Sequence, residues 1–326
     1  MFKRHNDKLI FNIESIITIQ TSLSPLFITG IIDGEGYFSF SINKNNKSQL
    51  GWTIAPRFGI CMHIRDLKLI KDIQTFFKVG TCKQSRLFCS FDVNSIKELE
   101  IIIDHFKHYP LQSSKRYAFY IFLTIFNIYK NKEHLTREGF LLAIAYINIL
   151  NKNIKQDVIV SIIKIHGSLP NLILPPVQYI DKIINPNPWW INGFIVGEGS
   201  FTYFKRTRST ISGIIKTDYT LVFEVSQKTE DSYLLIAILN FFGVGTLFTE
   251  KKGISRFRIT SVSILYHIIL PYFNLFPLLG FKKKQYDIWL KAVCILISNK
   301  NWSKEREELL TVQLKKLSML TNNKNY

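Results

Sequence analysis

The chain has 326 residues and 47% hydrophobic content, enough for one large folded domain or two of ordinary size, which excludes a disordered tail. Its 42 Lys and Arg against 24 Asp and Glu give a formal net charge of +18, which indicates a polyanionic partner, either nucleic acid or an acidic membrane surface. The four cysteines lack the spacing of a zinc site or disulfide framework. The longest apolar stretches, 117–129 and 140–150, are too short for the ~20 residues of a spanning helix, so we interpret them as buried helices. We expect no membrane partner.

We expect no import signal in the N-terminal segment. It lacks the apolar core of a secretory peptide, and the early acids Asp7 and Glu14 argue against a transit peptide. The cysteine usage favours a reducing compartment. A bias toward Ile, Asn, Lys, Phe and Tyr fits an AT-rich, for example organellar, genome.

The first elements in the chain are an apolar helical run over 28–36 that ends in Gly-Glu-Gly, and an alternating segment that predicts a half-buried strand. The polar face of that strand consists of Tyr37, Ser39, Ser41 and Asn43. The next elements are a strand near 54–62, a helix over 67–77 after Asp66, two strands around a turn at 84–86, a helix from about Ser95, and a helical stretch over 115–150 broken at 131–139.

The chain then repeats this plan. Ile-Thr-Gly-Ile-Ile-Asp-Gly-Glu-Gly ends at Gly36, and Ile-Asn-Gly-Phe-Ile-Val-Gly-Glu-Gly ends at Gly199. Residues 58–81 align without a gap on 223–246, with nine of 24 positions identical. Each copy therefore predicts an αββαββα unit of the α+β class. We expect an N-terminal unit over 1–150, a proline-containing linker over 151–188 and a C-terminal unit over 189–326.

The repeated glutamates, Glu35 and Glu198, are the strongest candidates for chemistry. A carboxylate at a helix C-terminus opposes the helix dipole, so its presence in both copies calls for a reason. Divalent metal supplies one, because Mg²⁺ takes carboxylate, phosphate and water oxygens. Gly34 and Gly197 can add a backbone carbonyl as a further ligand. The alternative is that the acids are solvated turn residues and that the glycines only end helices.

Two further sets of residues are candidates for supporting roles. Gly30 and Gly193 lie one helical turn before the second motif glycine, where small residues let two helices cross closely; ordinary helix-to-sheet packing is the alternative. Lys115 and Lys282 follow Pro-Leu at matching places and can stabilise a phosphate or activate water, or are surface lysines. Gln227 can orient water in one half only, since Met62 holds the matching position.

A polar and basic strand face after the second motif predicts DNA contact, since arginine reads guanine and hydroxyls are adaptable. The basic hairpin that follows extends this surface, chiefly for phosphate contact. Any one of these residues could instead be merely solvated. The strand set is Ser200, Thr202, Phe204, Arg206 and Arg208, and the hairpin set is Lys251, Lys252, Arg256 and Arg258.

With both motifs and their duplicated flanks in view, the chain resembles the LAGLIDADG homing endonucleases in their single-chain, two-motif form. The segment 130–139 and the Asn-Pro-Trp-Trp sequence over 187–190 are similar to fungal mitochondrial members encoded within introns. The resemblance implies motif helices packed at the centre of two pseudosymmetric units and a saddle-shaped antiparallel sheet over a long DNA site.

The resemblance also implies an activity. Glu35 and Glu198 would bind the metals, with Lys115, Lys282 and Gln227 in support, and a monomer would cut both strands across the minor groove, leaving 3′ overhangs. Mg²⁺ is the implied cofactor, Mn²⁺ would substitute, and Ca²⁺ would bind without supporting cleavage. Intron mobility and a mitochondrial location follow from the same resemblance.

Two competing functions stay open at this point. One is an intron RNA maturase on the same scaffold, and the other is a DNA-binding module without cleavage. Retention of both acids argues against the second. The copies are not equivalent, because Val196 stands where the first copy has Asp33 and Met62 stands opposite Gln227.

Overall fold

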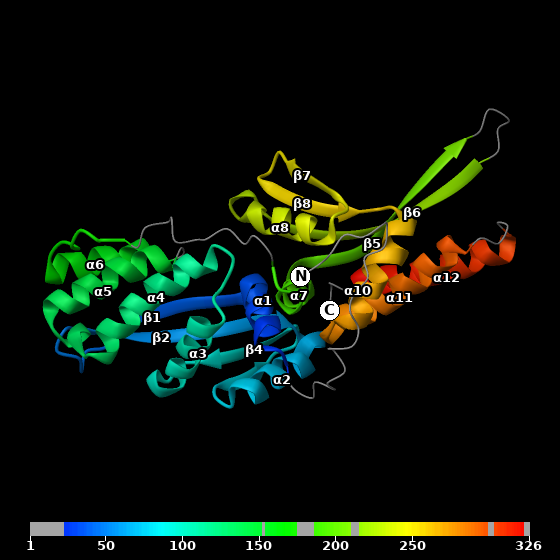
Figure 1. Cartoon of the computed structure of the whole chain (residues 1–326). Coiled ribbons are helices and arrows are strands. Elements are labelled where there is room, and N and C mark those ends of the chain that lie inside the picture. The colour runs from blue at the N-terminus through cyan, green and yellow to red at the C-terminus, as the bar shows by residue number, and fades with distance from the viewer. Residues whose placement is uncertain (1–22, 152–153, 175–185, 210–214, 299–302, 323–326) are drawn as a thin grey trace. The chain divides into compact units, whose positions relative to one another are not determined.

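The computed structural model describes residues 23–151, 154–174, 186–209, 215–298 and 303–322 (Figure 1). They form two compact units, which we call the first unit, residues 32–182, and the second unit, residues 1–31 together with 183–326. Helix α1 (Pro25–Glu35) begins in the second unit and ends in the first.

The first unit contains a four-stranded antiparallel sheet in the order β1-β2-β4-β3. Apart from α6, the helices lie along the chain where the periodicity predicts them, and the break in the 115–150 stretch separates α4 from α5. The elements are β1 (Gly36–Lys44), β2 (Trp52–His63), α2 (Leu67–Phe77), β3 (Thr81–Gln84), β4 (Phe88–Val93), α3 (Ile96–His108), α4 (Lys115–Lys130), α5 (Arg137–Leu150) and α6 (Gln156–His166), with short 3₁₀ turns at Ile64–Asp66 and Glu133–Leu135.

The second unit repeats the topology, with a sheet in the order β5-β6-β8-β7. The prediction of two pseudosymmetric α+β units is therefore confirmed. The elements are α7 (Pro188–Glu198), β5 (Gly199–Ser209), β6 (Ile215–Lys228), α8 (Ser232–Phe242), β7 (Thr246–Glu250), β8 (Ile254–Ile259), α9 (Val262–Ile264), a π turn (Leu265–Ile269), α10 (Leu270–Leu275), α11 (Gly280–Ile297) and α12 (Lys304–Asn322), with a 3₁₀ turn at Thr229–Asp231.

The core of the first unit lies between one face of the sheet and the helices. Phe38 on β1 has ring contacts with Phe58 on β2, with Phe106 on α3 and with Phe122 on α4, at centroid distances of 5.3 to 5.6 Å. All four rings are buried. Since side chains alternate along a strand, this packing directs the polar residues of β1 to the opposite face, which we call the outer face.

The second unit has the same arrangement. Phe201 on β5 stacks on Phe223 of β6 at 5.2 Å and contacts Trp289 of α11 at 5.2 Å. The Trp289 indole N–H also donates to the Thr202 carbonyl, 3.0 Å away, which satisfies a group on the edge strand. The π turn ends two residues before Pro271, which has no N–H to continue the helical ladder.

The two motif helices cross within the second unit. A Cβ atom added at Gly30 of α1 would collide with the Trp190 carbonyl, and one added at Gly193 of α7 would collide with the Phe27 carbonyl. The helices thus meet backbone to backbone at these two glycines, as predicted for a close crossing. Helix-to-sheet packing does not explain these contacts.

Two helices were not predicted as separate elements. Helix α6 lies within the stretch that we interpreted as linker, and the His166 ring that ends it contacts Phe140 of α5 at 5.6 Å. Helix α12 packs on α11, where the Arg306 guanidinium donates to the carbonyls of Ile295, Leu296 and Ser298 at 2.6 to 3.1 Å. Among the described residues no helix is long and apolar enough to cross a membrane.

Candidate functional site

Each motif glutamate is the last residue of its helix. Glu35 ends α1 and Glu198 ends α7, both are half-buried, and a strand begins at the next residue. The glycine after each acid makes this sharp change possible. A Cβ at Gly36 would overlap Ile32, and one at Gly199 would overlap Ile195, so no other residue lets the strand leave the helix in this direction.

In the first unit a lysine lies directly beside the motif. The Lys115 ammonium, at the start of α4, donates to the carbonyls of Gly34 and of Ile32, the latter at 3.2 Å. The C-terminal carbonyls of α1 thus hold a cation, as the helix dipole favours. A carbonyl has two lone pairs, so the predicted role of Gly34 as a metal ligand is compatible with this hydrogen bond and stays a prediction.

Asp33 fixes the segment that carries this lysine. Its buried carboxylate accepts hydrogen bonds from the backbone N–H of Gln112 at 3.0 Å, from that of Ser113 at 2.9 Å and from the Ser113 hydroxyl at 2.6 Å. The Ser113 hydroxyl oxygen in turn accepts from the Lys115 N–H at 3.2 Å. Asp33 therefore anchors the first turn of α4 and does not point to solvent as a ligand.

The second unit holds its lysine differently. The Lys282 ammonium donates to the carbonyl of Gly199, which follows Glu198, whereas Lys115 donates to the carbonyl of Gly34, which precedes Glu35. The residue that matches Asp33 is the buried Val196. Here the fully buried Asn192 amide on α7 donates to the Pro277 carbonyl, 2.8 Å away, in the segment before α11. The two units thus anchor matching segments from different positions on their motif helices.

Gln227 and Met62 occupy matching places near the ends of β6 and β2. Met62 is buried in the core. Gln227 is half-buried, and its side-chain oxygen accepts from the Lys228 N–H at 3.2 Å. A water-orienting role for Gln227 stays a prediction.

A free thiol also lies near the first glutamate. In the β1–β2 register Gly36 faces Ile60, which brings Cys61 of β2 close to the end of α1. Burial, and then the negative charges of Glu35 and Asp92, raise the pKa of the Cys61 thiol. This thiol is therefore neutral at physiological pH.

The donor set agrees with a hard divalent ion. Within the described ranges no group of three or more His, Cys, Asp or Glu side chains could form a metal cage made of protein alone. One carboxylate with a nearby carbonyl suits Mg²⁺, which keeps water and takes substrate phosphate as ligands, better than it suits zinc.

The outer face of the first sheet carries the predicted polar residues. Ser41 and Asn43 are exposed, and Tyr37 and Ser39 are half-buried. Two further residues of this face, Arg57 and Asp92, were not predicted from the sequence. The Arg57 guanidinium on β2 donates to the Asp92 carboxylate on β4 at 2.6 and 2.9 Å, and the Tyr37 hydroxyl donates to the same oxygen at 2.8 Å.

The Asp92 side chain is itself fully buried. Burial opposes its ionisation, but the hydrogen bonds from Arg57, Tyr37 and Ser90 outweigh that cost and hold the pKa of this carboxyl below its ordinary value. The alternation of Arg57, Gly59 and Cys61 with buried residues could have revealed this second polar strand.

The outer face of the second sheet is more basic. Ser200 and Thr202 are half-buried, Phe204 and Arg206 are exposed, and the side chain of Arg208 lies outside the described set. Lys251 and Lys252 are exposed at the β7–β8 turn. Arg256 and Arg258 on β8 both pair with Glu224 of β6, which the sequence did not single out.

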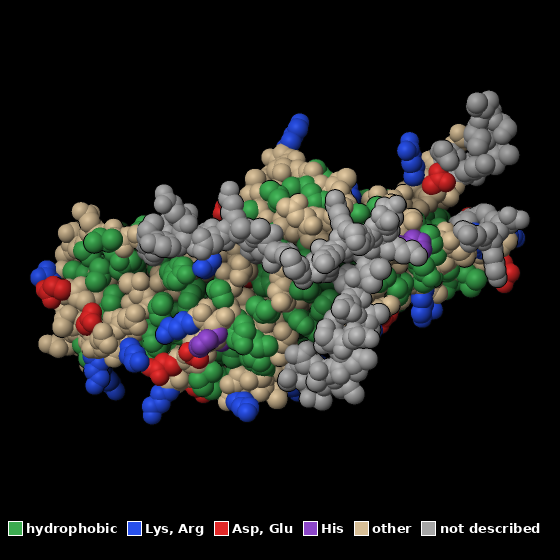
Figure 2. All heavy atoms as spheres, viewed as in Figure 1, with side chains coloured by type: hydrophobic (Ala, Val, Ile, Leu, Met, Phe, Trp, Pro, Cys, Tyr) green, Lys and Arg blue, Asp and Glu red, His purple; other side chains and the backbone are tan. Residues whose placement is uncertain are grey.

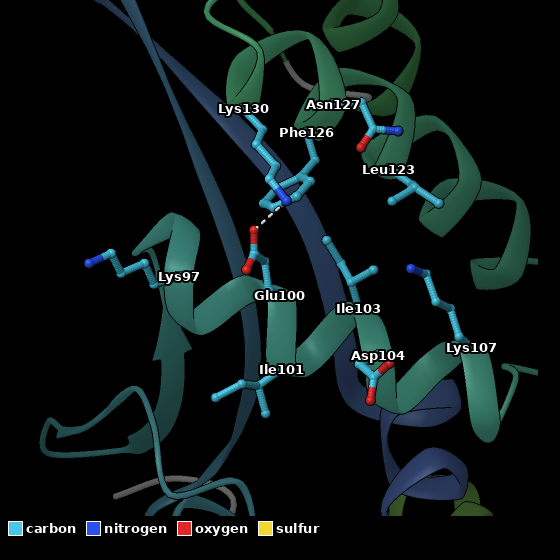
Figure 3. Close-up of a pocket in the computed structure, with 10 residues that line it drawn as sticks. All are labelled: Lys97, Glu100, Ile101, Ile103, Asp104, Lys107, Leu123, Phe126, Asn127 and Lys130. Atoms are coloured by element: carbon cyan, nitrogen blue, oxygen red, sulfur yellow. Dashed lines mark ion pairs between the residues drawn. The ribbon is translucent and has the colours of Figure 1, made fainter.

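A groove lies elsewhere in the first unit, between α3 and α4 (Figure 3). Ile103 and Phe126 contribute to it, and Lys130 forms an ion pair with Glu100 at 2.7 Å across it. The core rings of α3 and α4 pack against the inner sheet face, so this groove is on the helix layer, away from the outer face. Figure 2 shows basic and acidic side chains intermixed over these helices.

The two units share one fold, and each carries a glutamate at the end of its motif helix, a lysine in the first turn of a later helix and a polar or basic sheet face. The chain belongs to the LAGLIDADG endonuclease family, whose model matches residues 28–126 and 191–293.

Two curated relatives are the probable intron-encoded endonucleases 3 and 2 of Neurospora crassa. The first is 29% identical over 87% of this chain and 52% of its own length. The second is 30% identical over 91% of this chain and 65% of its own length. The chain thus spans between half and two thirds of these relatives.

Solved structures agree on the fold. The homing endonuclease I-GzeII, determined in complex with its DNA target, has a TM-score of 0.75 and 27% identity, with 90% of this chain and 98% of that chain covered. I-SmaMI, bound to uncleaved DNA with calcium ions, has a TM-score of 0.76 and 24% identity, with 93% and 99% covered.

Proposed function

We propose that this protein is a site-specific double-strand DNA endonuclease, a homing endonuclease that hydrolyses phosphodiesters with a divalent metal. It cuts across the minor groove of a long target, leaves 3′ overhangs and supports intron mobility. The observation that carries the proposal is the occurrence, in both units, of a glutamate at the end of the motif helix and a lysine that donates to carbonyls of the same segment.

Each unit's residues have separate roles in this proposal. Glu35 and Glu198 hold Mg²⁺, with the carbonyls of Gly34 and Gly197 as further oxygen donors. When bound, the ion supplies a low-pKa water and neutralises charge on the scissile phosphate. Lys115 and Lys282 place a positive charge beside each acid, where it stabilises charge that develops on phosphate oxygens. Gln227 orients water in the second unit only.

The sheets provide the DNA surface. Exposed Lys251 and Lys252 at the β7–β8 turn suit phosphate contacts, which give affinity without sequence information. The serine, threonine and asparagine side chains of β1 and β5 suit adaptable base contacts. The net charge of +18 supports a nucleic-acid partner.

The comparisons favour DNA over RNA as substrate. I-GzeII was solved with a DNA target, and the two Neurospora relatives carry the name of intron-encoded endonucleases. We also propose that the protein acts as a monomer and that it is located in the mitochondrion. A yeast relative, 26% identical, is named as a mitochondrial protein.

The test is cleavage of a DNA library in Mg²⁺ by the intact protein and by Glu35→Gln and Glu198→Gln. We expect specific double-strand cuts with 3′ overhangs, lost in both variants, while binding in Ca²⁺ is retained. Glu138→Gln on α5 and Glu308→Gln on α12 are controls, since both acids are exposed and each lies in one unit. No specific cut by the intact protein, together with tight binding to intron RNA or to DNA alone, would refute the proposal.

A further inference from the structure

The outer faces of the two sheets each carry a buried acid, and the two acids lie in equivalent cross-strand rows. In the first sheet Tyr37, Gly59, Asp92 and Thr81 are cross-strand neighbours in one row. In the second sheet the matching row is Ser200, Glu224, Arg258 and Thr246. The acid thus lies on β4 in one unit and on β6 in the other, so the two units build the same chemistry from different residues.

In the first row the acid orients an arginine. Asp92 is fully buried, whereas the Arg57 side chain is 46% exposed, so the arginine and not the acid can reach a ligand over the sheet. The guanidinium donates two hydrogen bonds to one Asp92 oxygen and lies over the Tyr37 ring, 5.4 Å from its centroid. A Cβ at Gly59 would collide with the Tyr37 hydroxyl, so the glycine leaves room for this arrangement.

In the second row Arg258 is held in the same way. Its guanidinium forms a charged pair with Glu224 at 2.6 Å and lies between two aromatic rings, 5.4 Å from Phe204 and 4.6 Å from Phe248. Arg256 shares Glu224 and also pairs with Glu250 at 2.7 Å. Each sheet therefore presents one arginine that is fixed by an acid and by at least one aromatic ring.

A fixed and charge-paired arginine suits base readout better than phosphate contact. Phosphate contacts draw their free energy from positive charge, which a paired carboxylate largely cancels. A guanine edge requires two donors in a set direction, and the acid supplies that direction without removing the remaining N–H groups. The exposed lysines at the β7–β8 turn are the contrasting case.

On the basis of the DNA-binding function proposed above, we propose that Arg57 and Arg258 are specificity-determining residues that each read one guanine in the major groove, one per half-site, and that Asp92 and Glu224 are their positioning residues. The acids act through the arginines and do not touch DNA. Each half-site of the target then contains one G·C pair that a single arginine reads.

The test is a binding profile of the full chain against all single base-pair changes in its selected target, in Ca²⁺ so that no product forms. Two conservative arginine variants, Arg57→Lys and Arg258→Lys, keep the positive charge but lose the paired, planar N–H donors of the guanidinium. Asp92→Asn and Glu224→Gln keep the shape of each acid. Lys252→Ala serves as the phosphate-contact control, and thermal melting is recorded for every variant.

We expect Arg57→Lys and Asp92→Asn to lose about 5- to 150-fold of discrimination at one and the same G·C pair, and Arg258→Lys and Glu224→Gln at a second. Lys252→Ala should weaken all sequences equally. A lower melting temperature with an unchanged profile would assign the acids a structural role only and overturn the inference. So would a uniform loss of affinity, or losses at unrelated positions. If Asp92→Asn does not fold, Glu224→Gln decides. Failure of the wild-type protein to select any duplex would instead refute the proposed function.

Discussion

Asp33 offers the sharpest test of how the first unit positions its lysine. Val196 of the second motif matches Asp33 of the first, so Asp33→Val makes the two motifs alike at this position. The two backbone N–H groups of Gln112 and Ser113 would lose their acceptor, and a buried unpaired donor costs about 1–3 kcal/mol, so we expect roughly 2–6 kcal/mol of destabilisation. Asp33→Asn should cost less, because one oxygen can still accept from both donors.

The same change should affect catalysis on one strand. Without its anchor the start of α4 is free to shift, and with it the Lys115 ammonium; a misplacement of about 1 Å costs on the order of 100-fold in rate. The second unit uses Asn192 and Pro277 instead, so its centre should be unaffected. We therefore expect Asp33→Val to accumulate nicked DNA before linear product.

The assay follows both labelled strands of one duplex target, at a temperature where each variant is folded, with Val196→Ala as the matched control. The ratio of the two cutting rates is the decisive quantity, because a smaller folded fraction lowers both rates equally. If Asp33→Val melts earlier but keeps the wild-type ratio, the carboxylate stabilises the fold without positioning Lys115.

Three further predictions concern stability. Gly30→Ala should disrupt the helix crossing and prevent two-state folding or lower the melting temperature by more than 10 °C, because its Cβ meets the Trp190 backbone, which cannot rotate away; calorimetry measures this. Arg306→Ala should cost about 1–3 kcal/mol in urea unfolding, because several carbonyls at the end of α11 lose their charged donor. Burial lowers the pKa of His105 from 6.5 to about 4, so the unfolded state binds the proton first. Stability should therefore fall by up to about 3 kcal/mol as the pH decreases from 6.5 to 4, and in His105→Phe this slope should disappear.

Local patterns predicted most of the fold. The alternation after the first motif located β1 and its two faces, Asp66 marked the start of α2, and the Lys251-Lys252-Gly253 segment marked the β7–β8 turn. These features depend on residues near one another in the chain. Helix α6 was not predicted, because the prolines of the same stretch indicated a linker and its apolar pattern is short.

The contacts of the site were less predictable, since they join residues far apart in sequence. In the sequence Asp33 is one of the acids of the motif, but the backbone N–H groups that donate to it, those of Gln112 and Ser113, are 79 and 80 positions away. Arg57 reads as an isolated charge, and its partner Asp92 is 35 positions away. Sequence periodicity assigns a residue to a face, but it does not say which distant backbone N–H or carboxylate meets it there.

The two units hold the segment before the lysine through different contacts. Lys115 and Lys282 both reach carbonyls beside a terminal glutamate, although one helix start is held by Asp33 and the other segment by Asn192. The Asp33 carboxylate accepts from backbone N–H groups, whereas the Asn192 amide donates to a backbone carbonyl. The two units therefore hold matching segments through opposite kinds of hydrogen bond. The glutamate and the lysine are present in both units while the anchor differs, so we expect the proposed reaction to require the glutamate and the lysine, and different contacts to hold the lysine in place in each unit.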